Sequence, residues 1–122
     1  MLGGHAFTAS RAHADFLFLN GLTPDLRDWA FPRFGPESGR AARELALGGL
    51  AVDAGAVRCP TLVIGAEQDR ITPAALQRRI AVRYRADYQE AAGHAHMLML
   101  EEGRERPFKD MLAWMERALD ER

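Results

Sequence analysis

The sequence predicts an α/β fold built on a small parallel two-stranded sheet. Three observations predict it: an apolar run at 61–65 after a proline, an amphipathic stretch directly behind it, and a second strand-like run at 87–91. Strand, helix and strand joined by short loops form a βαβ unit, in which the strands are parallel and the crossover is right-handed. The expected boundary separates a mainly helical segment, 1–56, from a βαβα part, 57–122.

Two helices are expected in the first segment. Pro24–Trp29 is predicted to form a short helix and Glu37–Leu47 a longer one, with Ala41 and Leu45 among its apolar positions. The stretch Phe31–Pro36 contains two prolines and a glycine, so it is expected to break the chain between the helices.

The second segment begins with the clearest strand. Thr61–Gly65 is apolar and partly β-branched, which is typical of a strand buried on both faces of a parallel sheet. A polar loop then ends at Thr72, the predicted N-cap of a helix from Pro73 to about Arg85. The apolar positions of this helix recur every four residues, at Leu76, Ile80 and Tyr84.

A second strand and a last helix complete the predicted unit. Asp87–Ala91 is less apolar than the first strand, which indicates a place nearer the sheet edge. The loop 92–105 leads into a closing helix with one apolar face, formed by Phe108, Met111, Leu112, Met115 and Leu119.

Composition narrows the functional classes. The net charge of −1 gives no electrostatic reason to expect nucleic acid or an anionic membrane as a partner. No apolar run approaches the roughly 20 residues that a membrane-spanning helix needs. The single cysteine, Cys59, cannot form an internal disulfide, so the expected location is cytoplasmic.

Polar residues with catalytic potential follow both predicted strands. Asp69 lies in the loop after the first strand, and His94 and His96 lie in the loop after the second. In an open α/β sheet, catalytic groups project from the carboxyl ends of the strands. A carboxylate bonded to one imidazole nitrogen fixes the tautomer and stabilises the imidazolium that forms when the other nitrogen takes a proton. Asp69 and one of the two histidines are therefore a candidate catalytic pair.

Two motifs resemble the C-terminal part of the α/β-hydrolase family. The run Arg58–Pro73 is similar to the family's penultimate-strand motif, CPtLvi-G-x-x-D-x-i-x-P, which presents the acid of a Ser-His-Asp triad. Ala92–Glu101 resembles the final motif, P-G-x-G-H-x-x-x-x-E, which carries the triad histidine. The resemblance implies a partial α/β-hydrolase fold, with Asp69 as the acid and a helical N-terminal segment derived from the family's cap.

The triad histidine can be assigned in two ways. His96 stands five residues before Glu101 and three after Gly93, as the family spacing requires. His94 has a glycine directly before it, as the family histidine usually has, but its distance from Glu101 differs. We favour His96, with His94 as the alternative; Ala95 departs from the glycine that often precedes the family histidine.

The family's nucleophile is not found in these 122 residues. It sits in a G-x-S-x-G turn, where backbone N–H groups also bind the oxyanion. Ser10 and Ser38, the two serines, lack that spacing, and Cys59 precedes its strand, at the opposite end from the loops. By resemblance, the function is hydrolysis of a small-molecule ester, amide or related acyl bond without a cofactor, by an enzyme truncated here to the half that lacks its nucleophile. We expect activity to require the missing N-terminal half.

Two alternatives use the same residues differently. His94, His96 and Asp69 could together supply three ligands to a zinc ion. A non-enzymatic interaction module is the other alternative, because two strands alone leave unpaired edges and uncovered apolar faces. That alternative predicts a homo-oligomer formed through strand edges.

Overall fold

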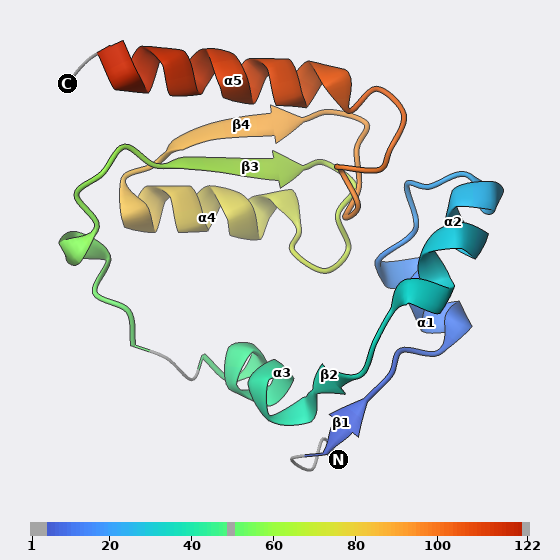
Figure 1. Cartoon of the computed structure of the whole chain (residues 1–122). Coiled ribbons are helices and arrows are strands. Elements are labelled where there is room, and N and C mark those ends of the chain that lie inside the picture. The colour runs from blue at the N-terminus through green and yellow to red at the C-terminus, as the bar shows by residue number, and fades with distance from the viewer. Residues whose placement is uncertain (1–4, 49–50, 121–122) are drawn as a thin grey trace.

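A computed structural model describes residues 5–48 and 51–120 and has a mixed α/β architecture (Figure 1). Two short two-stranded sheets and several helices make up these ranges. In chain order the elements are β1 (Ala6–Phe7), α1 (Arg11–Leu17), α2 (Pro24–Ala30), the 3₁₀ turn η1 (Phe31–Arg33), β2 (Glu37–Ser38), α3 (Gly39–Ala46), the 3₁₀ turn η2 (Ala54–Ala56), β3 (Leu62–Ala66), α4 (Ala74–Tyr84), β4 (Asp87–Ala91) and α5 (Glu105–Asp120).

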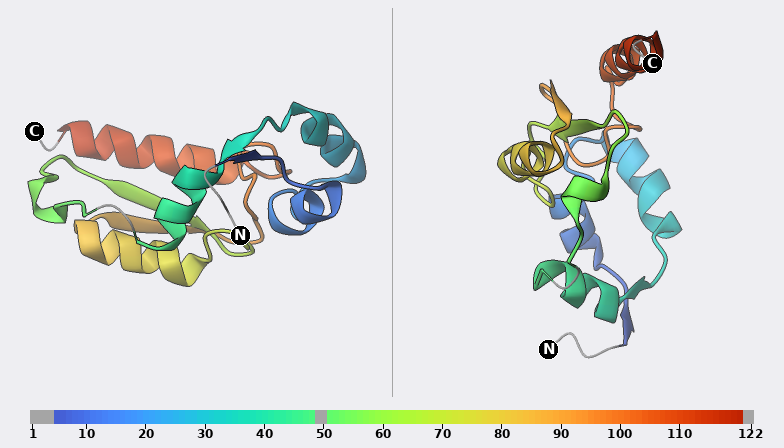
Figure 2. Two further views of the ribbon diagram at one scale, coloured as in Figure 1. Left: turned by 90° about the horizontal axis from the view of Figure 1, so that it is seen from below. Right: turned by 90° about the vertical axis from the view of Figure 1, so that its left-hand side faces the viewer.

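The predicted parallel sheet is confirmed. β3 pairs with β4 in parallel register, from Leu62 opposite Asp87 to Ala66 opposite Ala91. β4 has the predicted bounds, and β3 begins and ends one residue later than expected. The crossover helix α4 covers one face of this sheet and α5 lies over the other (Figures 1 and 2).

The start of α4 differs from the prediction. The helix begins at Ala74, with Pro73 in the capping position and no side-chain cap bond. Thr72, the expected cap, donates its hydroxyl to Asp69 Oδ2 instead, at 2.7 Å. Because the Thr72 side chain is bonded to Asp69, it stabilises the loop and does not cap the helix.

The closing helix leaves much of its apolar face uncovered. Phe108, Leu112 and Met115 retain more than two fifths of their surface, and Leu119 is 62% exposed. The polar contacts of α5 with β4 include a hydrogen bond of 2.6 Å from Trp114 Nε1 to Asp87 Oδ2. Large apolar patches on a protein surface typically mark a place where another chain or segment packs.

The N-terminal helices pack beside the loops that follow β3 and β4 (Figure 1). The pattern predicted α2, whereas α1 was not predicted. A small core joins the two helices through Ala14, Leu19, Leu22 and Ala30, and Met97 and Leu100 from the second loop pack against that core. The N-terminal segment is thus attached to the part of the chain that carries the candidate histidines.

A second, antiparallel pair of strands was also not predicted. β1 and β2 pair through Ala6 with Ser38 and Phe7 with Glu37. Because Glu37 and Ser38 are in this pair, the predicted Glu37–Leu47 helix begins only at Gly39, where Ser38 caps it.

Within residues 5–48 and 51–120, no helix combines the length and the apolar character needed to cross a bilayer.

Candidate functional site

Asp69 is fixed in the turn after β3 by its own neighbours. Its Oδ1 accepts hydrogen bonds from the backbone N–H groups of Ile71, at 2.8 Å, and Thr72, at 2.9 Å. The Thr72 hydroxyl donates to Oδ2 at 2.7 Å. An aspartate that accepts from residues two and three positions later forms an Asx-type turn, so the sequence Asp-x-x-Thr itself orients the carboxylate.

His96 meets this carboxylate from the second loop. Its Nδ1 lies 3.1 Å from both Asp69 oxygens. A carboxylate only accepts hydrogen bonds, so Nδ1 carries the proton and the neutral ring has its lone pair on Nε2. Within the described parts of the chain, no group hydrogen-bonds Nε2, and the His96 side chain is 27% exposed against 7% for Asp69. The imidazole can therefore accept a proton from a group that approaches from outside.

The charge of the pair is set by competing effects on Asp69. Burial raises the pKa of this carboxyl, but hydrogen bonds from Thr72, His96 and Ile71 outweigh burial, and the pKa lies below the ordinary aspartate value. Asp69 is thus an anion at neutral pH. An anion at Nδ1 stabilises an imidazolium formed by proton uptake at Nε2.

Further hydrogen bonds tie the two loops together. Glu67 Oε2 accepts from the N–H of Gly93 at 2.7 Å, and the N–H of Gln68 donates to the carbonyl of His94 at 2.8 Å. Gly93 has a φ of +76°, a conformation that glycine adopts at little cost. Glu67 thus links the acid loop to the histidine loop.

The N-terminal segment contributes one wall of the site. The ring of Phe18 packs edge-on against His96, with centroids 5.4 Å apart and planes at 68°. Asn20 donates to the carbonyl of Gln68 at 3.0 Å, and Arg70 to that of Phe16 at 2.9 Å. Sequence reasoning assigned Phe16, Phe18 and Asn20 no part in the site, because contacts between residues about fifty to eighty positions apart leave no local pattern.

The other histidine has a different partner. His94 Nδ1 lies 3.1 Å from Glu101 Oε2, and both side chains are buried. The structure therefore brings His96, and not His94, to Asp69. The zinc alternative required His94, His96 and Asp69 to converge, whereas among residues 5–48 and 51–120 no three histidine, cysteine or acidic side chains gather as a metal site.

Both serines are occupied as helix caps. Ser10 Oγ accepts from the N–H of His13 and also lies 2.9 Å from His13 Nδ1, at the start of α1. Ser38 Oγ accepts from the N–H of Ala41 at the start of α3. Cys59 is exposed on the segment that precedes β3, the end of the strand opposite Asp69.

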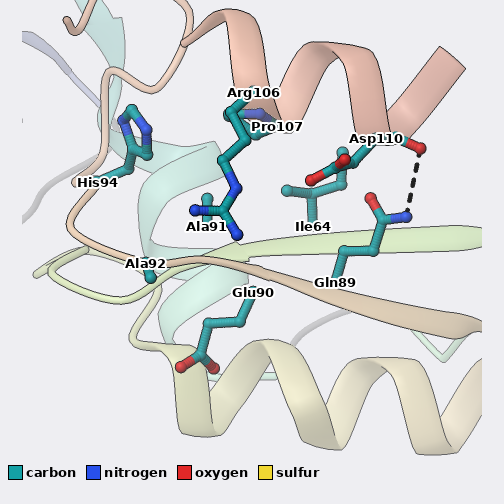
Figure 3. A pocket seen from close by; sticks show the side chains of 9 residues that line it. All are labelled: Ile64, Gln89, Glu90, Ala91, Ala92, His94, Arg106, Pro107 and Asp110. Carbon is teal, nitrogen blue, oxygen red and sulfur yellow. Dashed lines mark hydrogen bonds between the residues drawn. The ribbon is translucent and has the colours of Figure 1, made fainter. Parts of the chain in front are cut away.

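A small hollow lies away from the paired residues. It is bounded by β3, β4 and α5, has a volume of about 70 Å³, and is lined in part by Ile64, His94 and Arg106 (Figure 3). Asp69 and His96 do not line it. A volume of this size holds a few water molecules at most, so we do not assign a substrate to it.

Comparison with protein-family models, with curated proteins and with solved structures found no match. The case for a function therefore depends on the arrangement of Asp69, His96 and the residues around them.

Proposed function

We propose that this chain supplies the acid and the base of a serine-hydrolase-type site that cleaves an ester, amide or related acyl bond. The observation that carries the proposal is the pairing of His96 Nδ1 with the Asp69 carboxylate at 3.1 Å, in adjacent loops after two parallel strands. On this proposal the chain is a partial α/β-hydrolase fold, its residues 1–56 derive from the cap, and it acts in the cytoplasm without a cofactor.

Each residue has a defined role in the proposed reaction. His96 Nε2 takes the proton of a hydroxyl nucleophile as that hydroxyl attacks the acyl carbon, and later returns the proton to the leaving group. Asp69 holds the ring by Nδ1 and stabilises the imidazolium. The hydroxyl comes from outside these 122 residues, because Ser10 and Ser38 serve as helix caps.

An ester-cleavage assay tests the proposal without the missing serine. A small alcohol added in excess replaces the serine hydroxyl, and a short-chain nitrophenyl ester supplies the acyl group. General-base catalysis contributes about 10²–10⁴-fold in intact sites, so we expect a measurable rate that His96→Ala and Asp69→Ala each reduce at least tenfold.

His13→Ala is the matched control, since His13 is exposed and distant in sequence from the paired residues. It should leave the rate unchanged. Equal rates in the wild type, His96→Ala, Asp69→Ala and His13→Ala would overturn the proposal. The ester would then be cleaved without the Asp69–His96 pair.

A second candidate function rests on a separate observation. Within the described residues β3 pairs only with β4, although β3 consists of apolar residues and glycine, and α5 exposes Phe108, Leu112 and Leu119. An uncovered strand edge beside apolar surface favours pairing with a second copy of the chain. Sedimentation at increasing concentration should then reveal a homodimer; a monomer throughout would exclude this candidate.

A further inference from the structure

Glu101 lies in an unusual position for a carboxylate. Its surface is 3% exposed, and its Oε2 accepts hydrogen bonds from the N–H of Ala95, at 2.8 Å, and from His94 Nδ1, at 3.1 Å. Its Oε1 is also buried and has no partner among the described residues. Burying a carboxylate is costly, and the hydrogen bonds from Ala95 and His94 offset part of that cost.

The group that Glu101 holds is the backbone next to His96. Ala95 is fully buried and directly precedes His96 in the chain. The bond to the N–H of Ala95 fixes its backbone, which sets the direction in which the His96 side chain leaves the main chain. On the other side, the carbonyl of His94 accepts from the N–H of Gln68, the residue before Asp69.

The N-terminal segment closes over the same carboxylate. A Cβ atom at Gly21 would lie 2.5 Å from Glu101 Cδ and Oε1, so the backbone of residue 21 touches the carboxylate directly. Three residues earlier, Phe18 packs against the His96 ring. The turn after α1 therefore contacts both Glu101 and His96.

We propose that Glu101 is a positioning residue: together with His94 and the backbone of Gly21, it aims the imidazole of His96 at Asp69. This inference rests on the proposed function, in which His96 is the general base. It assigns Glu101 no contact with substrate. It predicts that moving the Glu101 carboxylate changes the state of the His96 ring.

The test reads that ring state by ¹⁵N NMR of the histidine side chains at a pH where they are neutral. In the wild-type chain, His96 should be the single Nδ1–H tautomer, because Asp69 accepts from Nδ1. Glu101→Ala should give a mixture of both tautomers. Glu101→Gln should restore the single tautomer, since its amide oxygen still accepts from Ala95.

A pair of glycine variants tests the inference with Glu101 intact. Gly21→Ala forces the carboxylate aside and should also produce mixed tautomers. Gly35→Ala is the matched control, since a Cβ there meets no atom within 4 Å, and it should behave as wild type. The ¹⁵N–¹H spectrum of α4 residues confirms in each case that the fold persists.

The outcomes separate this inference from the proposed function. A single His96 tautomer in all variants would overturn the positioning role while leaving the catalytic pair intact. Mixed His96 tautomers already in the wild-type chain would show that Asp69 does not hold Nδ1–H, and both proposals would then be wrong. A correctly positioned His96 without His96-dependent ester cleavage would refute the proposed function alone.

Discussion

Two histidine–carboxylate pairs lie next to each other after β4, and they differ in how far solvent reaches them. His94 pairs with Glu101 and His96 with Asp69, each through Nδ1 at 3.1 Å. The side chains of the first pair are 11% and 3% exposed, and those of the second are 27% and 7% exposed. The same chemical groups at the same distance thus sit in two environments.

The difference in exposure gives the two pairs different roles, one structural and one suited to proton transfer. His94 is buried, with Gly103 close to its ring. Its partner Glu101 also accepts a hydrogen bond from the N–H of Ala95. The ring of His96 is partly exposed, and its second nitrogen has no hydrogen-bond partner among the described residues. A buried pair can fix a loop, whereas only the partly exposed pair can exchange a proton with a reactant. The comparison predicts that removing a carboxylate costs stability in proportion to its burial.

The largest loss of stability is expected at the buried pair. Glu101→Ala leaves the N–H of Ala95 and the ring of His94 without an acceptor, so the free energy of unfolding should fall by on the order of 3 kcal/mol. Urea denaturation measures the loss. Glu102→Ala, at the exposed neighbouring position, is the control and should change stability by less than ~0.5 kcal/mol. Similar losses in both variants would contradict the bracing role.

A smaller and pH-dependent loss is expected at the partly exposed pair. Asp69→Asn should destabilise the chain by about 1.5–3 kcal/mol at neutral pH, because charge-assisted hydrogen bonds become neutral ones. The folded pKa of Asp69 is lowered, so its stabilisation is complete above the unfolded value and is lost as pH falls through the folded pKa. The gap between wild type and variant should therefore close in acid.

Unfolding curves from pH 7 to pH 2 measure that gap. Glu102→Gln, measured alongside at neutral pH, should change the free energy of unfolding by less than ~0.5 kcal/mol. A gap between wild type and Asp69→Asn that stays constant down to the lowest pH would show that charge is not what Asp69 contributes.

A single hydroxyl tests the turn that orients Asp69. Thr72→Val removes the 2.7 Å bond to Oδ2 and should cost about 1 kcal/mol. Thr61→Val is the matched control, because that hydroxyl donates to the exposed carbonyl of Cys59, and its removal should cost less. Equal costs would indicate that Thr72 only fills space beside the carboxylate.

The sequence predicted the part of the fold in which local pattern is strong. The apolar run of β3 and the four-residue spacing in α4 are local features, and β4 was found at its predicted bounds. The spacing from His96 to Glu101 also favoured the histidine that the structure pairs with Asp69. The catalytic role of that pair stays a prediction.

The rest depended on contacts that local pattern does not encode. α1 was not predicted because its seven residues are mostly polar or small, and Ala14 is the one residue of this helix that is buried in the core. Phe18 contacts His96, and the backbone of Gly21 contacts Glu101, although the two residues of each pair are about eighty positions apart in the sequence. Thr72 was expected to cap α4 because threonine favours that position, but a nearby carboxylate offered it a charged partner.

The smallest effect is expected at a more exposed ion pair, which extends the comparison to a third degree of burial. Arg78 on α4 forms an ion pair with Glu90 on β4, with both side chains at least 30% exposed. Arg78→Ala should cost no more than about 1 kcal/mol, and the cost should shrink in 1 M salt because screening weakens exposed charges. Arg79→Ala, at the next exposed position, is the control for lost helix contacts. If Arg78→Ala lowered the free energy of unfolding as much as Glu101→Ala, burial would not determine how strongly each pair stabilises the fold. The distinction between a structural pair and a reactive pair would then have no physical basis.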